Sequence, residues 1–170
     1  EKSFDEAKQW DEEAIRLQPN YIVAHHNLGL IYQLQEEYDK AETSYKKAIK
    51  INPNYSPVYN NLGSILIKQG KIIEAEDYYN QAIKFDKRNP ETYNNLGIVL
   101  LRLGKIEKAK IAYEQALTYK NDYAEAHYNL AFCLQKLGNL DEALEAYKQA
   151  LIVKPDYANA ESNMLDLLKN

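Results

Sequence analysis

The chain has 170 residues and a formal net charge of −4, and 45% of its residues are hydrophobic. A chain of this length and composition can form a folded domain. Its negative charge argues against nucleic acid as the main partner, because phosphate binding needs a basic surface. No run approaches about 18 uninterrupted apolar residues, so we expect no membrane insertion.

A repeat of 34 residues organises the chain. Its clearest marker is an alanine that recurs in one register, as Ala7, Ala41, Ala75, Ala109 and Ala143. In chain order, the period predicts the second half of a repeat, complete repeats, and then the first half of another. These segments are 1–21, then 22–55, 56–89, 90–123 and 124–157, and last 158–170.

Each complete repeat is predicted to form two antiparallel helices. In 56–89, apolar residues recur at helical spacing on both sides of Gly70. A glycine in this place is typical of a helix C-terminus. Asn89 and Pro90 then form a start signal for the next first helix.

Small residues mark where the two helices approach each other. The first helices carry them at Gly29, Gly63, Gly97 and Ala131. The second helices carry a tyrosine in register, at Tyr45, Tyr79, Tyr113 and Tyr147. One repeat cannot bury both of its faces, so we expect the repeats to stack.

This pattern resembles the tetratricopeptide repeat (TPR) family. Residues 22–55 match its motif most fully, through Leu28, Gly29, Tyr32, Ala41, Tyr45, Ala48 and Pro53. The resemblance implies an all-α fold, a right-handed α-solenoid of antiparallel helix pairs formed by residues 1–170. It also implies that first helices line a concave groove. Because 1–21 has no first helix, we expect the native chain to extend further toward its N-terminus.

The first helices carry an asparagine series. Its members are Asn27, Asn61, Asn95, Asn129 and Asn163. An amide offers both a donor and an acceptor, so such a row suits the backbone of an extended peptide. It also suits hydrogen bonds between helices or with water, as a feature of the repeat alone. Residues that precede the series are added to the candidate site, namely His26, Asn60, Asn94 and Tyr128.

Two further rows flank the series on the same predicted face. The apolar candidates for holding peptide side chains are Leu30, Ile98, Leu101 and Phe132. The basic row is Lys68, Arg102 and Lys136. These cations either bind acidic groups or are solvated ends of first helices.

The leading hypothesis is a non-catalytic protein–protein interaction scaffold that binds an extended peptide in the concave groove. An alternative is the substrate-recognition region of a larger enzyme such as a glycosyltransferase, because the asparagine series resembles the TPR region of protein O-linked N-acetylglucosamine transferases. A third hypothesis is self-association through the end helices into a homo-oligomer. The start lacks a Met and a signal-peptide core, which is typical of a fragment, and we expect a cytoplasmic location.

Several chemistries are not expected. The histidines are too far apart along the chain or the helix for a metal site, and Cys133 aligns with core positions. We therefore predict no catalytic residue, no metal and no cofactor. TPR clamps for chaperone EEVD-type C-termini need a set of Lys, Arg and Asn on successive first helices, and only Asn61 fits that set. We predict no binding of such peptides.

Overall fold

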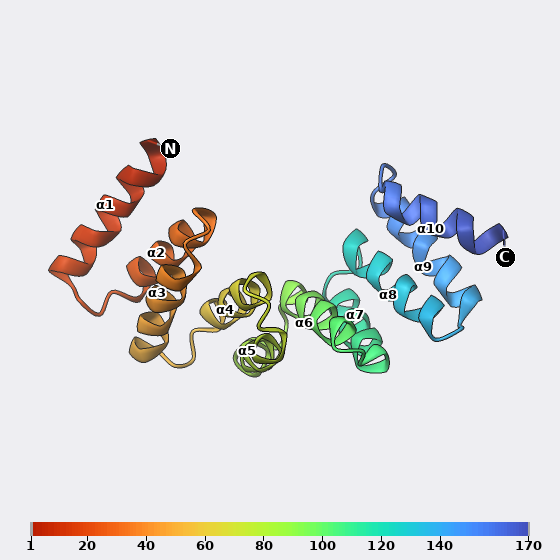
Figure 1. The fold of residues 1–170 in the computed structure, drawn as a ribbon, viewed down its shortest axis with the longest axis horizontal. Coiled ribbons are helices and arrows are strands. Elements are labelled where there is room, and N and C mark those ends of the chain that lie inside the picture. Colours follow the sequence, from red (N-terminus) through yellow and green to blue (C-terminus); the bar gives the residue numbers. More distant parts are fainter. Residues whose placement is uncertain (1, 170) are drawn as a thin grey trace. The chain divides into compact units, whose positions relative to one another are not determined.

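The computed structural model describes residues 2–169, and the side chains of 4–169. This part of the chain is all helical and runs as successive antiparallel pairs (Figure 1). The helices are α1 (Lys2–Leu17), α2 (Ile22–Leu34), α3 (Tyr38–Ile51), α4 (Ser56–Lys68), α5 (Ile72–Phe85), α6 (Pro90–Arg102), α7 (Ile106–Tyr119), α8 (Ala124–Lys136), α9 (Leu140–Val153) and α10 (Ala158–Lys169). The predicted all-α fold of paired helices is confirmed.

Helix boundaries follow the predicted signals. Asn89 caps α6, since its side chain accepts a hydrogen bond from the backbone N–H of Thr92. The turns inside the pairs contain a residue with positive φ, which glycine adopts without steric cost. That residue is Gly70, Gly104 or Gly138 in three turns, but Glu36 with a φ of 60° in the turn after α2.

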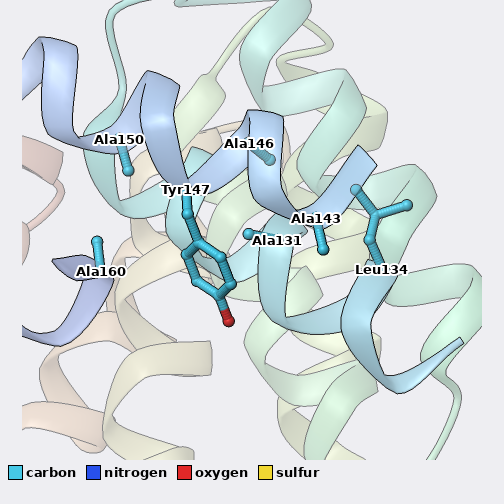
Figure 2. Packing of buried hydrophobic residues seen from close by; sticks show 7 residues of the cluster. All are labelled: Ala131, Leu134, Ala143, Ala146, Tyr147, Ala150 and Ala160. Carbon is cyan, nitrogen blue, oxygen red and sulfur yellow. The ribbon is translucent and has the colours of Figure 1, made fainter. Parts of the chain in front are cut away.

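The core of each pair is a tyrosine packed on a small residue. A Cβ atom added at Gly29 would lie 2.2 Å from Cε1 of Tyr45, and one at Gly97 would lie 2.5 Å from Cε1 of Tyr113. These distances are below any normal contact, so a larger residue at either place would require the tyrosine ring to shift. In the pair of α8 and α9, Ala131 takes this place beside Tyr147 (Figure 2).

The contacts divide the chain into two compact units, residues 1–86 and 87–170. In the N-terminal unit, α2 packs against α3 and α4 packs against α5, while α1 lies against α2. In the C-terminal unit, α6 packs against α7 and α8 packs against α9, while α10 lies against α9. A single continuous right-handed solenoid over residues 1–170 stays a prediction.

The single cysteine belongs to the core. Cys133 is fully buried, and burial raises the pKa of its thiol to about 11. A thiol of this kind is not a nucleophile at neutral pH. Between residues 2 and 169, no helix is long and apolar enough to cross a membrane.

Candidate functional site

The asparagine series lies on the first helices, and its amide nitrogens bind the preceding repeat. Nδ2 of Asn61 lies 2.9 Å from Nε2 of His26, and Nδ2 of Asn129 donates to Oδ1 of Asn94 over 3.1 Å. Nδ2 of Asn163 donates to the hydroxyl of Tyr128 over 3.2 Å. In each of these pairs the acceptor stands 35 positions earlier in the chain. The series therefore ties α4 to α2 in the N-terminal unit, and α8 to α6 and α10 to α8 in the C-terminal unit.

The start of the series uses a different acceptor. Asn27 donates from Nδ2 to Oδ1 of Asp11 on α1, over 3.2 Å. Asp11 occupies the register of the second-helix tyrosines, and Tyr147 likewise receives a hydrogen bond from Asn163, over 3.4 Å. The aspartate that departs from the family pattern thus keeps the contact that a tyrosine makes elsewhere.

In the N-terminal unit, His26 is the centre of a small polar cluster. Its Nδ1 lies 3.4 Å from the hydroxyl of Tyr55, while Nε2 faces the amide of Asn61. Because Nδ2 of Asn61 is a donor, Nε2 acts as the acceptor and the imidazole is neutral. Burial lowers the pKa of His26 from its ordinary value, which favours the same neutral form.

In the C-terminal unit, the equivalent residues are Asn94 and Tyr128, and Asn94 is the more enclosed of the two. Asn94 is 5% exposed, and a side-chain hydrogen bond links it to Tyr123. The ring of Tyr128 packs against those of Tyr147 and Tyr157, with centroid distances of 5.9 and 5.1 Å. These contacts indicate that Asn94 and Tyr128 hold neighbouring helices together, and direct contact of either with a ligand stays a prediction.

The amide oxygens of the series are available for other contacts. In the described part of the chain, no hydrogen bond reaches Oδ1 of Asn27, Asn61 or Asn129. Each of these side chains is half-buried, as is that of Asn95. An amide whose nitrogen is held by its own protein offers its oxygen in a fixed orientation, which lowers the entropy cost of a further hydrogen bond.

The flanking rows differ in exposure. The apolar side chains are half-buried, which leaves part of each surface open, and they are Leu30, Ile98, Leu101 and Phe132. Lys68, Arg102 and Lys136 are exposed. The ammonium group of Lys136 lies 5.3 Å from the ring centroid of Phe132, so these two rows meet on α8. Asn60, on α4, is half-buried.

The acceptor of two second-helix tyrosines was not predicted from the sequence. The hydroxyl of Tyr45 donates to Oε1 of Gln33 over 2.8 Å, and that of Tyr147 donates to Oε1 of Gln135 over 2.9 Å. The shared separation of 12 residues is the signal that reveals this pair. Leu101 stands in the glutamine position of α6, and the hydroxyl of Tyr113 is buried with no hydrogen-bond partner in the described residues.

Histidines and tyrosines share one task at the start of the first helices. The hydroxyl of Tyr59 donates to the carbonyl of Pro53, 2.6 Å away, and Nε2 of His25 lies 2.9 Å from the carbonyl of Pro19. His127 contacts the carbonyl of Asn121 over 2.8 Å in the same way. These contacts give His25 and His127 a structural role. In residues 2–169, no cluster of three or more metal-ligating side chains is found.

Comparisons with known proteins decide the family. One model of the tetratricopeptide repeat matches residues 22–55 and 124–157, and a second matches residues 55–122. The chain is a tetratricopeptide repeat protein. No curated protein matches this TPR chain in sequence.

Solved structures share the TPR fold. The TPR protein is similar to MamA, with 26% identity, a TM-score of 0.81 and coverage of 91% of both chains. It is also similar to YrrB, which is described as a TPR protein with an unusual peptide-binding site, with 22% identity, a TM-score of 0.79 and coverage of 95% of this chain and 84% of YrrB. In the Cut9–Hcn1 hetero-tetramer of APC/C, the match has 21% identity and a TM-score of 0.79 and covers 98% of this chain but 33% of the other.

Proposed function

We propose that this TPR protein is a non-catalytic interaction module that binds an extended peptide on its first helices. The observation that carries the proposal is the hydrogen bonding of the asparagine amides. The nitrogens of Asn61 and Asn129 bind the preceding repeat, whereas the oxygens of these half-buried side chains have no partner in the described part of the chain. Such oxygens can accept hydrogen bonds from peptide N–H groups whatever the peptide sequence.

Side-chain selectivity comes from the rows beside the amides. In the C-terminal unit, Ile98 and Phe132 offer apolar surface, and Arg102 and Lys136 are exposed cations. We propose that this unit prefers peptides with an apolar residue near an acidic one. In the N-terminal unit, Leu30 is followed by Leu34, which is 67% exposed, and Lys68 is the cation. We propose that this unit prefers more apolar segments.

A display library of unstructured peptides of about ten residues tests the proposal, since an extended peptide of that length spans about 33 Å. We expect enriched peptides to bind the wild-type protein, and we expect Asn61→Ala with Asn95→Ala to weaken them by about 1–3 kcal/mol in total, at the usual net value per hydrogen bond. Asn80→Ala is the matched control, because Asn80 is an exposed asparagine on the second helix α5. Equal affinities of the two variants would remove the first-helix amides from the mechanism.

A second test addresses the backbone contacts directly. Replacing successive peptide N–H groups with N-methyl groups removes the donors and keeps the side chains. If the amide oxygens accept from the peptide, methylation lowers affinity at some positions in the wild type and has little effect in the alanine variant. Equal losses in both proteins would assign the recognition to other groups.

The alternative function keeps the same surface but places it in a larger enzyme. The asparagine series is similar to the TPR region of protein O-linked N-acetylglucosamine transferases, so the peptide would then be a substrate. The complete reading frame distinguishes the two functions: a catalytic domain in the same chain supports the alternative, and its absence supports a scaffold. In either function we expect a cytoplasmic protein without affinity for EEVD-type C-termini, which a peptide titration checks.

A further inference from the structure

A second groove lies in the N-terminal unit, on the face of α2 that is turned away from the candidate peptide site. Helices α1 and α3 both pack against α2 (Figure 1). Between them, α2 contributes Leu28 and Tyr32 to the floor of the groove. At helical spacing, the candidate peptide contacts His26, Asn27 and Leu30 project from the opposite side of α2. The two surfaces are therefore separate, and we call the second one the α1–α3 groove.

The α1–α3 groove consists of two adjoining cavities. The first has a volume of about 490 Å³, and its apolar lining is Ile15, Leu28 and Tyr32. The second has a volume of about 510 Å³ and adjoins the first, because Ile15 and Lys47 line both. The lining residues of α3 fall within 39–51, which corresponds to a helix rise of about 18 Å. This length matches about five or six residues of an extended peptide.

The end of the groove near Ile51 is positively charged. Lys47 and Lys50 line the second cavity from adjacent turns of α3, and no acidic residue is among the described residues that line it. Within residues 4–169, neither ammonium group takes part in an ion pair or a hydrogen bond. At the other end of α3, by contrast, Lys40 is paired with Glu37. The two unpaired cations are therefore available to the carboxylates of a ligand.

The acidic residues of the first cavity already have partners. A carboxylate oxygen of Glu12 lies 4.0 Å from Nζ of Lys8. The carboxylate of Asp39 accepts a hydrogen bond from Nε2 of Gln69 over 3.2 Å. These two carboxylates repel an acidic ligand less than unpaired ones would. The unbalanced charge of the groove is therefore positive and lies at the Ile51 end.

The lysines of α3 are not a feature of the repeat. This helix has four lysines and two acidic residues, so its net charge is +2. Among the other second helices that the structure describes, α1, α5 and α9 each have a net charge of −2, and α7 is neutral. The position of Lys47 is a glutamine in the next three second helices, at Gln81, Gln115 and Gln149. The stacking of repeats therefore does not require a cation there, which indicates a contact outside the repeat.

We propose that the α1–α3 groove binds a short acidic segment of a partner protein. Its carboxylates lie beside Lys47 and Lys50, where a positive surface in an acidic protein is complementary to them. An adjacent apolar side chain packs against the half-buried Ile15 and Tyr32. None of these residues is among the proposed contacts of the first-helix amides, so one molecule can hold both ligands at once.

Fluorescence anisotropy with a labelled probe peptide tests the binding. The probe is Phe-Ser-Leu-Asp-Glu-Glu, used in this order and in the reverse order. One control peptide has serine in place of both apolar residues, and another has lysine in place of the three acidic ones. We expect saturable binding of the probe in one order, which weakens as the salt concentration rises, and binding of both controls that is weaker by about tenfold or more. A probe that does not saturate at about 1 mM protein, or that binds no better than the lysine control, would overturn the proposal.

Charge reversal on α3 identifies the surface. We expect Lys47→Glu with Lys50→Glu to weaken binding of the probe about tenfold or more, because carboxylates then face carboxylates. The matched control is Lys46→Glu with Lys84→Glu, which gives the same net charge. Lys46 lies on α3 but lines neither cavity, Lys84 has the register of Lys50 on α5, and all four lysines are exposed. We expect the control to bind like the wild type, and equal losses in both variants would contradict the proposed site.

A third variant separates the groove from the first-helix amides. Asn61→Ala with Asn95→Ala should bind the acidic probe like the wild type, because neither asparagine lines the groove. Weaker binding by this variant would place the probe on the first helices and overturn the proposal. In NMR spectra, the probe should shift the amide signals of residues 39–51 more than those of α5. Shifts confined to residues outside α1, α2 and α3 would contradict the proposed site.

Sedimentation equilibrium without peptide tests whether a second copy of the chain occupies the groove. We expect the wild type and the variant with Lys47→Glu and Lys50→Glu to have the same mean mass at every concentration. A higher mass for the wild type alone would assign the groove to a second copy and overturn the proposed partner.

Discussion

The N-terminal and C-terminal units join their first helices with the same asparagine but with different acceptors. In the N-terminal unit Asn61 meets the titratable, half-buried His26, and in the C-terminal unit Asn129 meets the neutral, buried Asn94. The donor is constant and the acceptor varies in chemistry and exposure. The series therefore has a structural role in both units. We expect the chemistry and burial of the acceptor to determine how much each hydrogen bond contributes to stability.

The largest effect is expected from exchanging the small residue under the tyrosine. Gly29→Ala in the N-terminal unit places a Cβ atom against the ring of Tyr45, and we expect it to lower the free energy of unfolding by about 1–3 kcal/mol. The opposite change in the C-terminal unit, Ala131→Gly, adds no atom and should cost about 0.5–1 kcal/mol through helix propensity. Urea unfolding of both variants measures the difference, and equal losses would show that the ring of Tyr45 moves freely.

The next effect separates the two asparagine contacts directly. Asn129→Ala removes the amide that donates to Oδ1 of the buried Asn94, so we expect a loss of about 1–3 kcal/mol. Asn61→Ala removes the hydrogen-bond partner of His26. Since His26 is half-buried, water can replace that partner, so we expect a loss of only about 0.5–1 kcal/mol. Thermal unfolding of the two variants gives the order, and a larger loss for Asn61→Ala would reverse the comparison.

A smaller, stabilising effect is expected in a repeat that has leucine in place of the glutamine. Leu101→Gln supplies an acceptor for the buried hydroxyl of Tyr113, as Gln135 does for Tyr147. We expect a gain of about 0.5–1.5 kcal/mol, the usual net value of a hydrogen bond. Leu101→Met serves as a control of similar size without an oxygen. Equal stability of the two variants would mean that the hydroxyl of Tyr113 already has an acceptor.

The smallest effect is a pH dependence confined to the N-terminal unit. Burial lowers the pKa of His26 in the folded state, so its contribution to stability is fully present above the ordinary histidine pKa of about 6.5 and declines as the pH falls below it. His26→Asn, which copies Asn94, should remove this decline. Unfolding of both proteins between about pH 5 and pH 8 checks it, and identical pH profiles would exclude His26 as the cause.

Much of the fold could be predicted because the same packing residues recur in successive repeats. The tyrosine and glycine series fixed which helix faces meet, and glycines such as Gly70 gave the ends of first helices. Glu36 shows the limit, because its positive φ is set by the turn and not by the residue type.

The site could be predicted only in part. The position of the asparagines follows from their period, but their acceptors lie 35 residues earlier and change from histidine to asparagine to tyrosine. A partner that varies in this way leaves no periodic signal in one sequence. Exposure also depends on neighbouring repeats, so Asn60 and Asn94, which occupy the same register, look alike in the sequence but are half-buried and buried in the structure.

The hydrogen bonds at the start of the first helices have a kinetic consequence. The contact from Tyr59 to Pro53, like that from His25 to Pro19, joins residues only six positions apart. Closing such a short loop costs little conformational entropy, so we expect these contacts to form early in folding. A chain built from such local closures has low contact order, so folding can begin in any repeat and spread to its neighbours. We therefore expect amide hydrogen exchange to be slowest inside the complete pairs and fastest in α1 and α10, where a repeat is only half formed.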